Sequence, residues 1–164
     1  MELSQKQIQH LYLRAGFGAL PSEIEQWCGK EKDQIVETFF KSSKEFKSIN
    51  YLPYPLSEKE EQKGVSGFQI LKMILRSQKD MEELNLQWIF KMTWTKAQLR
   101  EKMVFFWHNH FATSAPFAYL MQEQNNLLRA HALGSFRKML LAVSQDPAML
   151  IYLNNQQNKK EHPN

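Results

Sequence analysis

Apolar side chains recur every three or four positions along most of this chain, which is the period of an amphipathic helix. Ile8, Leu11 and Tyr12 mark the first such segment, which Ser4 is placed to cap. The same period returns in segments that begin near Pro21, Ile35, Phe68, Thr95, Phe117, Ser135 and Pro147. No internal repeat and no convincing strand pattern is found, so the sequence predicts helices throughout.

Short polar signatures predict where several of these helices begin. The spacing of a capping box, in which two side chains satisfy backbone donors near each other, occurs in the stretches 22–25 and 95–98. Asp146 before Pro147 is a further start signal, because proline suits the first position of a helix.

Residues 48–66 lack the helical period. The stretch NYLPYPLSEKEEQKG holds two prolines and a charge run, which indicates a long loop. A plain connection is favoured over a mobile lid. The chain of 164 residues has only six Gly and six Pro, which argues against a turn-rich β-sandwich. The expected fold class is therefore all-α, an irregular multi-helix bundle with one long proline-containing loop near residues 48–66.

The charge and cysteine content exclude several classes. The net charge of +4 is a mild excess, and acidic and basic residues are interleaved along most of the chain. A nucleic-acid surface should be clustered and strongly basic, so this partner is disfavoured. Cys28 is the single cysteine, which rules out an internal disulfide. No stretch reaches the roughly 18 uninterrupted apolar residues expected of a membrane span.

The segment VFFWHNHF is the most distinctive candidate site. It is apolar on every side except where it carries His108, Asn109 and His110. A helix that is apolar all round is normally buried, and a buried imidazole or amide needs a hydrogen-bond partner. The sequence therefore predicts a buried His/Asn cluster whose partners come from elsewhere in the fold.

The spacing of the two histidines bears on metal binding. On an unbroken helix, His108 and His110 point about 200° apart, so they could not easily share one metal ion. The zinc pattern H-E-x-x-H is absent. A divalent metal is therefore left open but not favoured. A core histidine bonded to a carbonyl or carboxylate is the plainer interpretation of either ring.

Other catalytic patterns are missing or weak. The serine elbow G-x-S-x-G and the phosphate loops G-x-x-x-x-G-K-[ST] and G-x-G-x-x-G do not occur. His10 and Arg14 lie four apart and can share a helix face, where a surface pair is the plainer interpretation. Asn155 and Asn158 follow the apolar stretch AMLIYL, where capping or turn formation is the default.

Three blocks of the sequence carry a resemblance to a known family. HLYLRAGFG near the start resembles the H-L-L-x-R-A-G-F-G opening of the bacterial domain of unknown function 1800 family. LREKMVFFWHNHFATS resembles its central block, and residues 125–164 resemble the stretch that follows. WHNHF followed by RxHALGxF and DPAMLxYL is a specific combination, unlike a lone short motif.

The resemblance implies a helical fold and a longer protein. The family pattern continues with an acid-bearing helix, E-N-F-A-R-E-L, so residues 1–164 are expected to be the N-terminal part of the family domain, truncated at the C-terminus. Relatives often have Asp where this chain has Asn154, which weakens a metal site. Many members carry export signals, whereas MELSQKQIQH has no apolar stretch, so a cytoplasmic location is the default expectation.

Carried over by position, the resemblance adds candidate site residues but no established activity. The catalytic candidates are His108 and His110, which downstream acids would complete. The binding candidates are His10, Arg14, Asn109, Asn155 and Asn158.

Three functions stay open. The first is an enzyme or metal site built on the His/Asn cluster. The second is a structural or protein-interaction helical module with a buried hydrogen-bond network. Nucleic-acid binding is the weaker third. Self-association through apolar surface exposed by truncation is the one protein partnership that the sequence suggests.

Overall fold

The computed structural model describes residues 2–57, 60 and 63–161, and its regular elements are helices. An isolated antiparallel bridge pairs Glu2 with Glu31. The helices are α1 (Gln5–Ala15), α2 (Pro21–Trp27), α3 (Lys32–Ser42), α5 (Gly67–Trp94), α6 (Gln98–His110), α7 (Ala118–His131), α8 (Phe136–Ser144), α9 (Pro147–Tyr152) and the 3₁₀ turn η1 (Asn155–Gln157). The expected all-α class is confirmed.

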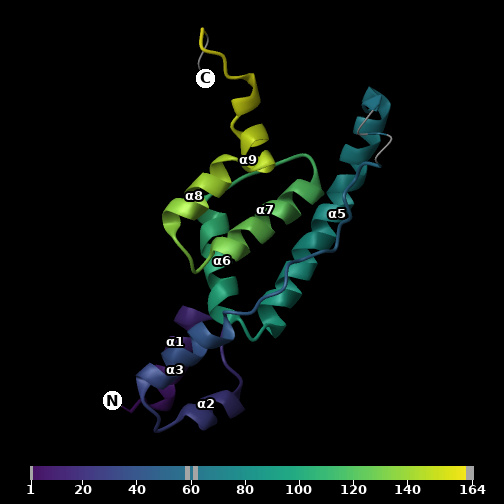
Figure 1. Cartoon of the computed structure of the whole chain (residues 1–164). Helices are drawn as coiled ribbons and strands as arrows, with labels where there is room; N and C mark the ends of the chain where they lie inside the picture. The colour runs from purple at the N-terminus through teal and green to yellow at the C-terminus, as the bar shows by residue number, and fades with distance from the viewer. Residues whose placement is uncertain (1, 58–59, 61–62, 162–164) are drawn as a thin grey trace.

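Helices α1, α2 and α3 gather at one end of the molecule around a small core (Figure 1). Ile8 and Ile35 are fully buried there, and the rings of Tyr12 and Phe39 meet edge to face at 4.8 Å. Leu99 of α6 packs against the same cluster, so α6 joins this end to the rest of the fold.

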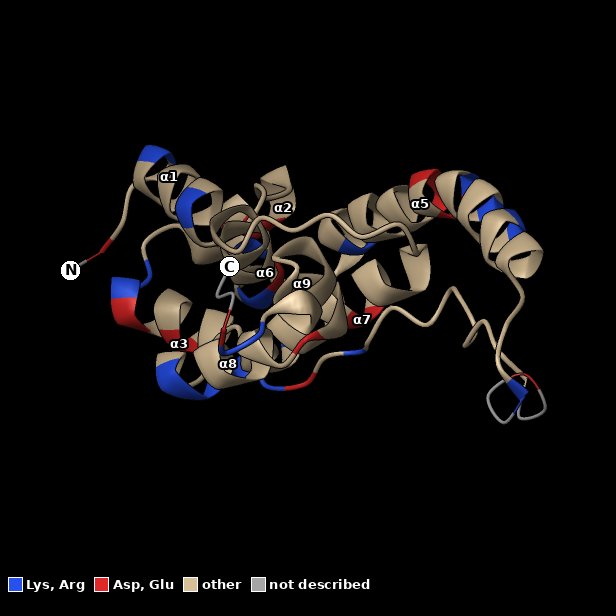
Figure 2. Cartoon of the chain, turned by 90° about the horizontal axis from the view of Figure 1, so that it is seen from above, with Lys and Arg blue, Asp and Glu red and all other residues tan. Residues whose placement is uncertain are grey.

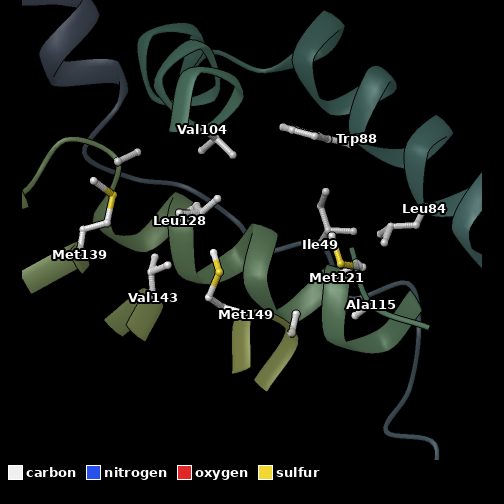
Figure 3. Packing of buried hydrophobic residues seen from close by; sticks show 12 residues of the cluster. Ile49, Leu84, Trp88, Val104, Ala115, Met121, Leu128, Met139, Val143 and Met149 are labelled. Carbon is white, nitrogen blue, oxygen red and sulfur yellow. The ribbon is translucent and has the colours of Figure 1, made fainter. Parts of the chain in front are cut away.

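The larger core surrounds α7, which packs against α5, α6, α8 and α9. Figure 3 shows side chains from all five helices converging on it. The labelled members are Ile49, Leu84, Trp88, Val104, Ala115, Met121, Leu128, Met139, Val143 and Met149. The helices cross at varied angles (Figure 1), so the bundle is irregular, as the sequence predicts.

The start signals have mixed outcomes. Asp146 accepts a hydrogen bond from the backbone of Met149 at 2.9 Å, so the predicted cap of α9 is confirmed. The capping box predicted at 22–25 is wrong, because Pro21 takes the first helical position and the cap falls on Leu20. There the N–H of Leu20 donates to Glu23 Oε2 at 2.8 Å.

The second predicted capping box, at 95–98, is also wrong. Thr95 ends α5, and α6 begins only at Gln98, after Ala97. The hydroxyl of Thr95 instead accepts from the N–H of Ala97 at 3.0 Å, which makes it part of the tight turn between the two helices. Helix α5 runs unbroken from Gly67 to Trp94.

Residues 48–57 form no regular element, which confirms that part of the predicted loop, whereas residues 60 and 63 are helical. The positions 58–59 and 61–62 of that loop lie outside the described residues. The loop is anchored rather than free, because the backbone of Ile49, Tyr51 and Leu52 is hydrogen-bonded to side chains of α7. None of the described helices has both the length and the apolar character needed to cross a membrane.

Candidate functional site

An ion pair between α6 and α7 lies at the centre of the fold. Arg129 Nε donates to Glu101 Oε1 at 2.6 Å, and Arg129 Nη2 donates to Glu101 Oε2 at 3.0 Å. Both side chains are 0% exposed. This two-pronged geometry matches the planar guanidinium to the planar carboxylate, which is the strongest form of such a contact.

Neighbouring side chains satisfy the remaining polar atoms of the pair. The indole N–H of Trp88 donates to Glu101 Oε2 at 3.3 Å. The amide oxygens of Asn125 and Asn126 accept from Arg129 at 2.6 and 2.8 Å. A buried charge costs several kcal/mol unless it is paired and hydrogen-bonded, and these partners offset that cost.

Arg100 extends the network toward α3. Its Nε donates to the carbonyl of Ser43 at 2.8 Å, and its Nη1 donates to the carbonyl of Arg129 at 2.6 Å. The guanidinium also lies over the ring of Phe46, 4.1 Å from its centroid. Arg100 therefore ties the loop after α3 and the C-terminal end of α7 to the first turn of α6.

A second polar group links α7 to α9. Gln124 Nε2 donates to Asp146 Oδ2 at 2.8 Å and to the hydroxyl of Thr113 at 3.1 Å. Burial raises the pKa of Asp146, while its hydrogen bonds from the backbone of Met149 and from Gln124 act in the opposite direction. The same carboxylate oxygen thus caps α9 and orients α7.

His108 is half-buried on the inner side of α6, and its ring meets Trp88 edge to face at 5.0 Å. Its Nδ1 is buried and has no hydrogen-bond partner among the described residues. Burial lowers the pKa of His108, because the charged imidazolium would lose its hydration there. The ring is therefore neutral at physiological pH.

The expected burial of Asn109 and His110 is wrong. Both are exposed, because α5, α3 and α7 pack on other sides of α6 and leave this side open. The ring of His110 stacks on Phe106, with centroids 6.2 Å apart and planes 10° apart. Since α6 is unbroken through His110, the two histidines diverge as their spacing predicts.

The remaining candidates are not brought to the histidines. His10 and Arg14 are exposed on α1, at one end of the molecule. Asn155 and Asn158 are exposed near η1, beyond α9 at the other end (Figure 1). The structure therefore separates the seven candidates into distinct regions.

Across residues 2–57, 60 and 63–161, no three His, Cys, Asp or Glu side chains are grouped closely enough to hold a metal ion. Both carboxylate oxygens of Glu101 already accept hydrogen bonds from Arg129 and Trp88.

Sequence reasoning missed the ion-pair network. The available signal was the position of each residue on its helix: Glu101 shares one face with Ala97 and Val104, and Arg129 shares one with Asn125 and Ala132. A charge in register with core positions needs a buried partner. The sequence could not reveal which partner, because the two residues are 28 positions apart.

These features define an all-helical protein whose helices α6 and α7 are joined by a buried ion pair. The chain belongs to the family described as "Protein of unknown function (DUF1800)", whose model matches residues 10–164. No curated protein and no solved structure matches the chain.

Proposed function

We propose that this chain is a helical interaction module that associates with a second copy of itself through the outer face of α5. The observation that supports this function is an apolar stripe on the side of α5 that faces away from the core. We call it the outer stripe. Its exposed apolar members are Phe68, Leu71, Leu75, Leu86, Ile89 and Phe90.

Helix α5 is apolar on two opposite sides. Ser77, Leu84 and Trp88 face the core and are buried. The outer stripe lies about half a helical turn away from them. Both views of the fold show α5 along the margin of the molecule, with its N-terminal end beyond the other helices (Figures 1 and 2). The stripe consists of two apolar patches, one toward each end of α5, separated by charged positions that include Lys79 and Glu82. Exposed apolar patches of this kind are typical of an interaction site.

The order of residues along the stripe favours a second copy in antiparallel orientation. About the point between Asp80 and Met81, Leu71 mirrors Phe90 and Leu75 mirrors Leu86. The symmetry is partial, because Phe68 mirrors Thr93 and Ile89 mirrors Lys72. An antiparallel partner would bring Leu75 opposite Leu86 and, at the centre, Lys79 opposite Glu82. This arrangement would place opposite charges against each other across the interface, in the manner of paired helices in coiled coils, in addition to the contact at 3.9 Å between Lys79 and Glu83 of the same copy.

The buried network supplies the rigid frame that such a surface needs. Trp88 of α5 donates to Glu101 of α6, which binds Arg129 of α7. The three helices are thus held in one register by directional contacts. This supports the structural or interaction module over an enzyme, although the network is built from other residues than the histidines.

Analytical ultracentrifugation of the chain at increasing concentration tests the proposal. We expect a monomer–dimer equilibrium that Leu75→Glu abolishes, because the charge would be buried against apolar side chains. Leu20→Glu is the matched control, since Leu20 is an exposed leucine on a different surface. A chain that stays monomeric at high micromolar concentration overturns the proposal.

Charge reversal at the centre tests the orientation. Lys79→Glu alone and Glu82→Lys alone should each weaken the dimer, whereas an equimolar mixture of the two variants should form heterodimers. The double variant should associate like the original chain. In a parallel dimer, Lys79 of one copy would lie opposite Lys79 of the other. The double variant would then not recover the affinity of the dimer. Self-association that none of these changes affects rejects α5 as the interface.

A second candidate function is an enzyme or metal site in which His108 transfers a proton or binds a metal ion. It is favoured by the buried, unpartnered Nδ1 of a neutral imidazole. A zinc or nickel titration followed by the NMR signals of the His108 ring tests it. If neither metal changes the His108 signals, and no other ligand added to the protein shifts them, this candidate is rejected.

A further inference from the structure

A cleft of about 920 Å³ lies between the segment that follows α3 and the turn that joins α5 to α6. Its lining is strongly basic. The lysines that line it are Lys41, Lys44, Lys47, Lys91 and Lys96. Glu45 is the one carboxylate among the lining residues. Five ammonium groups and one carboxylate give the lining a net charge of +4, which equals that of the whole chain.

The lysines of the cleft lack acidic partners. In the described part of the chain, none of the five ammonium groups lies within 4.0 Å of a carboxylate oxygen. By contrast, Arg76 and Lys79 on α5 each have an acidic neighbour one turn away, at 3.7 and 3.9 Å. Uncompensated like charges gathered in a cleft raise the local concentration of anions.

Lys91 makes the preference for an anion stronger. Burial is the main cause that lowers the pKa of Lys91, and the charges of Arg129 and Lys47 lower it further, against the favourable effect of Glu101. An anion that enters the cleft would compensate the positive charges of Lys91 and Lys47 together.

An aromatic ring stands beside these charges. Trp94, the last residue of α5, lines the cleft and is 81% exposed. It takes part in none of the ring contacts formed by the described residues. A large exposed indole next to unpaired lysines is the combination that binds the bases and phosphates of single strands, since every base has a flat face to stack.

We propose that this cleft binds single-stranded nucleic acid, with the lysines on the phosphates and Trp94 stacked on a base. The sequence disfavours nucleic acid because no basic cluster is visible along the chain. The fold supplies the cluster, because it brings residues 41–47 against residues 91–96. The cleft is independent of the outer stripe, so failure of self-association leaves this inference standing.

Fluorescence anisotropy of the whole chain with a labelled oligothymidylate tests the inference. We expect binding at low salt that weakens steeply as salt rises. Replacement of three exposed cleft lysines should weaken binding at least about tenfold at low salt. The variant is Lys44→Gln with Lys47→Gln and Lys96→Gln. Circular dichroism should show unchanged helix content, since these side chains are exposed.

A control triple variant separates a site from general surface charge. Lys6→Gln, Lys32→Gln and Lys138→Gln remove three exposed lysines outside the cleft and should leave affinity within about twofold. Equal loss in both triple variants overturns the inference, as does the absence of binding at low salt.

The indole separates nucleic acid from other polyanions. Trp94→Ala should weaken oligonucleotide binding by about fivefold or more, and Trp94→Phe should retain most of it. Inorganic polyphosphate and a duplex of the same length should bind more weakly than the single strand. Polyphosphate that binds as tightly, or a Trp94→Ala variant with full affinity, overturns the proposal in favour of a ligand without bases.

Discussion

Arg129 and Glu101 form a two-pronged ion pair in which both side chains are withdrawn from solvent. The removal of one partner leaves an uncompensated charge in the core. We expect Arg129→Met to reduce the free energy of unfolding by about 3–5 kcal/mol. Urea denaturation followed by circular dichroism measures this loss, and an unchanged midpoint would contradict it.

The double variant Glu101→Leu with Arg129→Met should be more stable than either single variant. Two apolar side chains leave no orphaned charge, and a hydrophobic replacement of a buried pair is often tolerated. The same denaturation experiment gives the coupling energy of the pair through a double-mutant cycle. Additive losses would show that the two groups do not act together.

The lowered pKa of His108 predicts how stability depends on pH. In the unfolded chain this imidazole takes up a proton near its ordinary pKa of 6.5, whereas in the folded chain it does so only at lower pH. The unfolded state therefore binds more protons in that window, and folding is favoured by rising pH. Stability should be complete above pH 6.5 and fall as the pH drops below it.

His108→Gln should remove this part of the pH dependence. The free energy of unfolding of both proteins, measured between about pH 5 and pH 8, gives the comparison. We expect the difference between them to shift in favour of the variant as the pH falls. A constant difference over the range would show that His108 titrates alike in both states.

Gln122 anchors the loop that precedes α5. Its side chain accepts from the backbone of Tyr51 and Leu52 at 2.9 and 2.8 Å and donates to the carbonyl of Leu52 at 2.9 Å. Gln122→Ala should cost about 1–3 kcal/mol and speed hydrogen exchange at the amides of Tyr51 and Leu52. Glu123→Ala is the control, since Glu123 is exposed on the same helix. Equal protection in both variants would contradict the anchor.

A side chain at Gly16 would crowd the side chain of Gln98. A Cβ atom added at Gly16 would come within 3.0 Å of the Cβ atom of Gln98, and nearer still to its amide. Gly16→Ala should therefore destabilise the contact between α1 and α6 by about 1–3 kcal/mol. Gly67→Ala has open space and should be neutral or slightly stabilising. Thermal unfolding of the two variants makes the comparison, and a neutral Gly16→Ala would show that Gln98 simply moves aside.

The candidate site shows which features could not be predicted from the sequence. The spacing of His108 and His110 correctly indicated that they point apart, because an unbroken helix fixes the angle between positions. Their burial could not be derived from the apolar residues around them. Phe105 and Phe106 are themselves exposed on α6, so the apolar character of this segment did not mean that it was covered.

The helical period, the prolines and the cap at Asp146 determined by themselves that this chain is all-α and where most of its helices lie, because those signals act over a few residues. Only the tertiary structure decided that Glu101 meets Arg129, that Gln122 holds the loop and that distant lysines share one cleft. Each of these depends on which helix faces which, and that is set by the packing of many side chains far apart in the sequence.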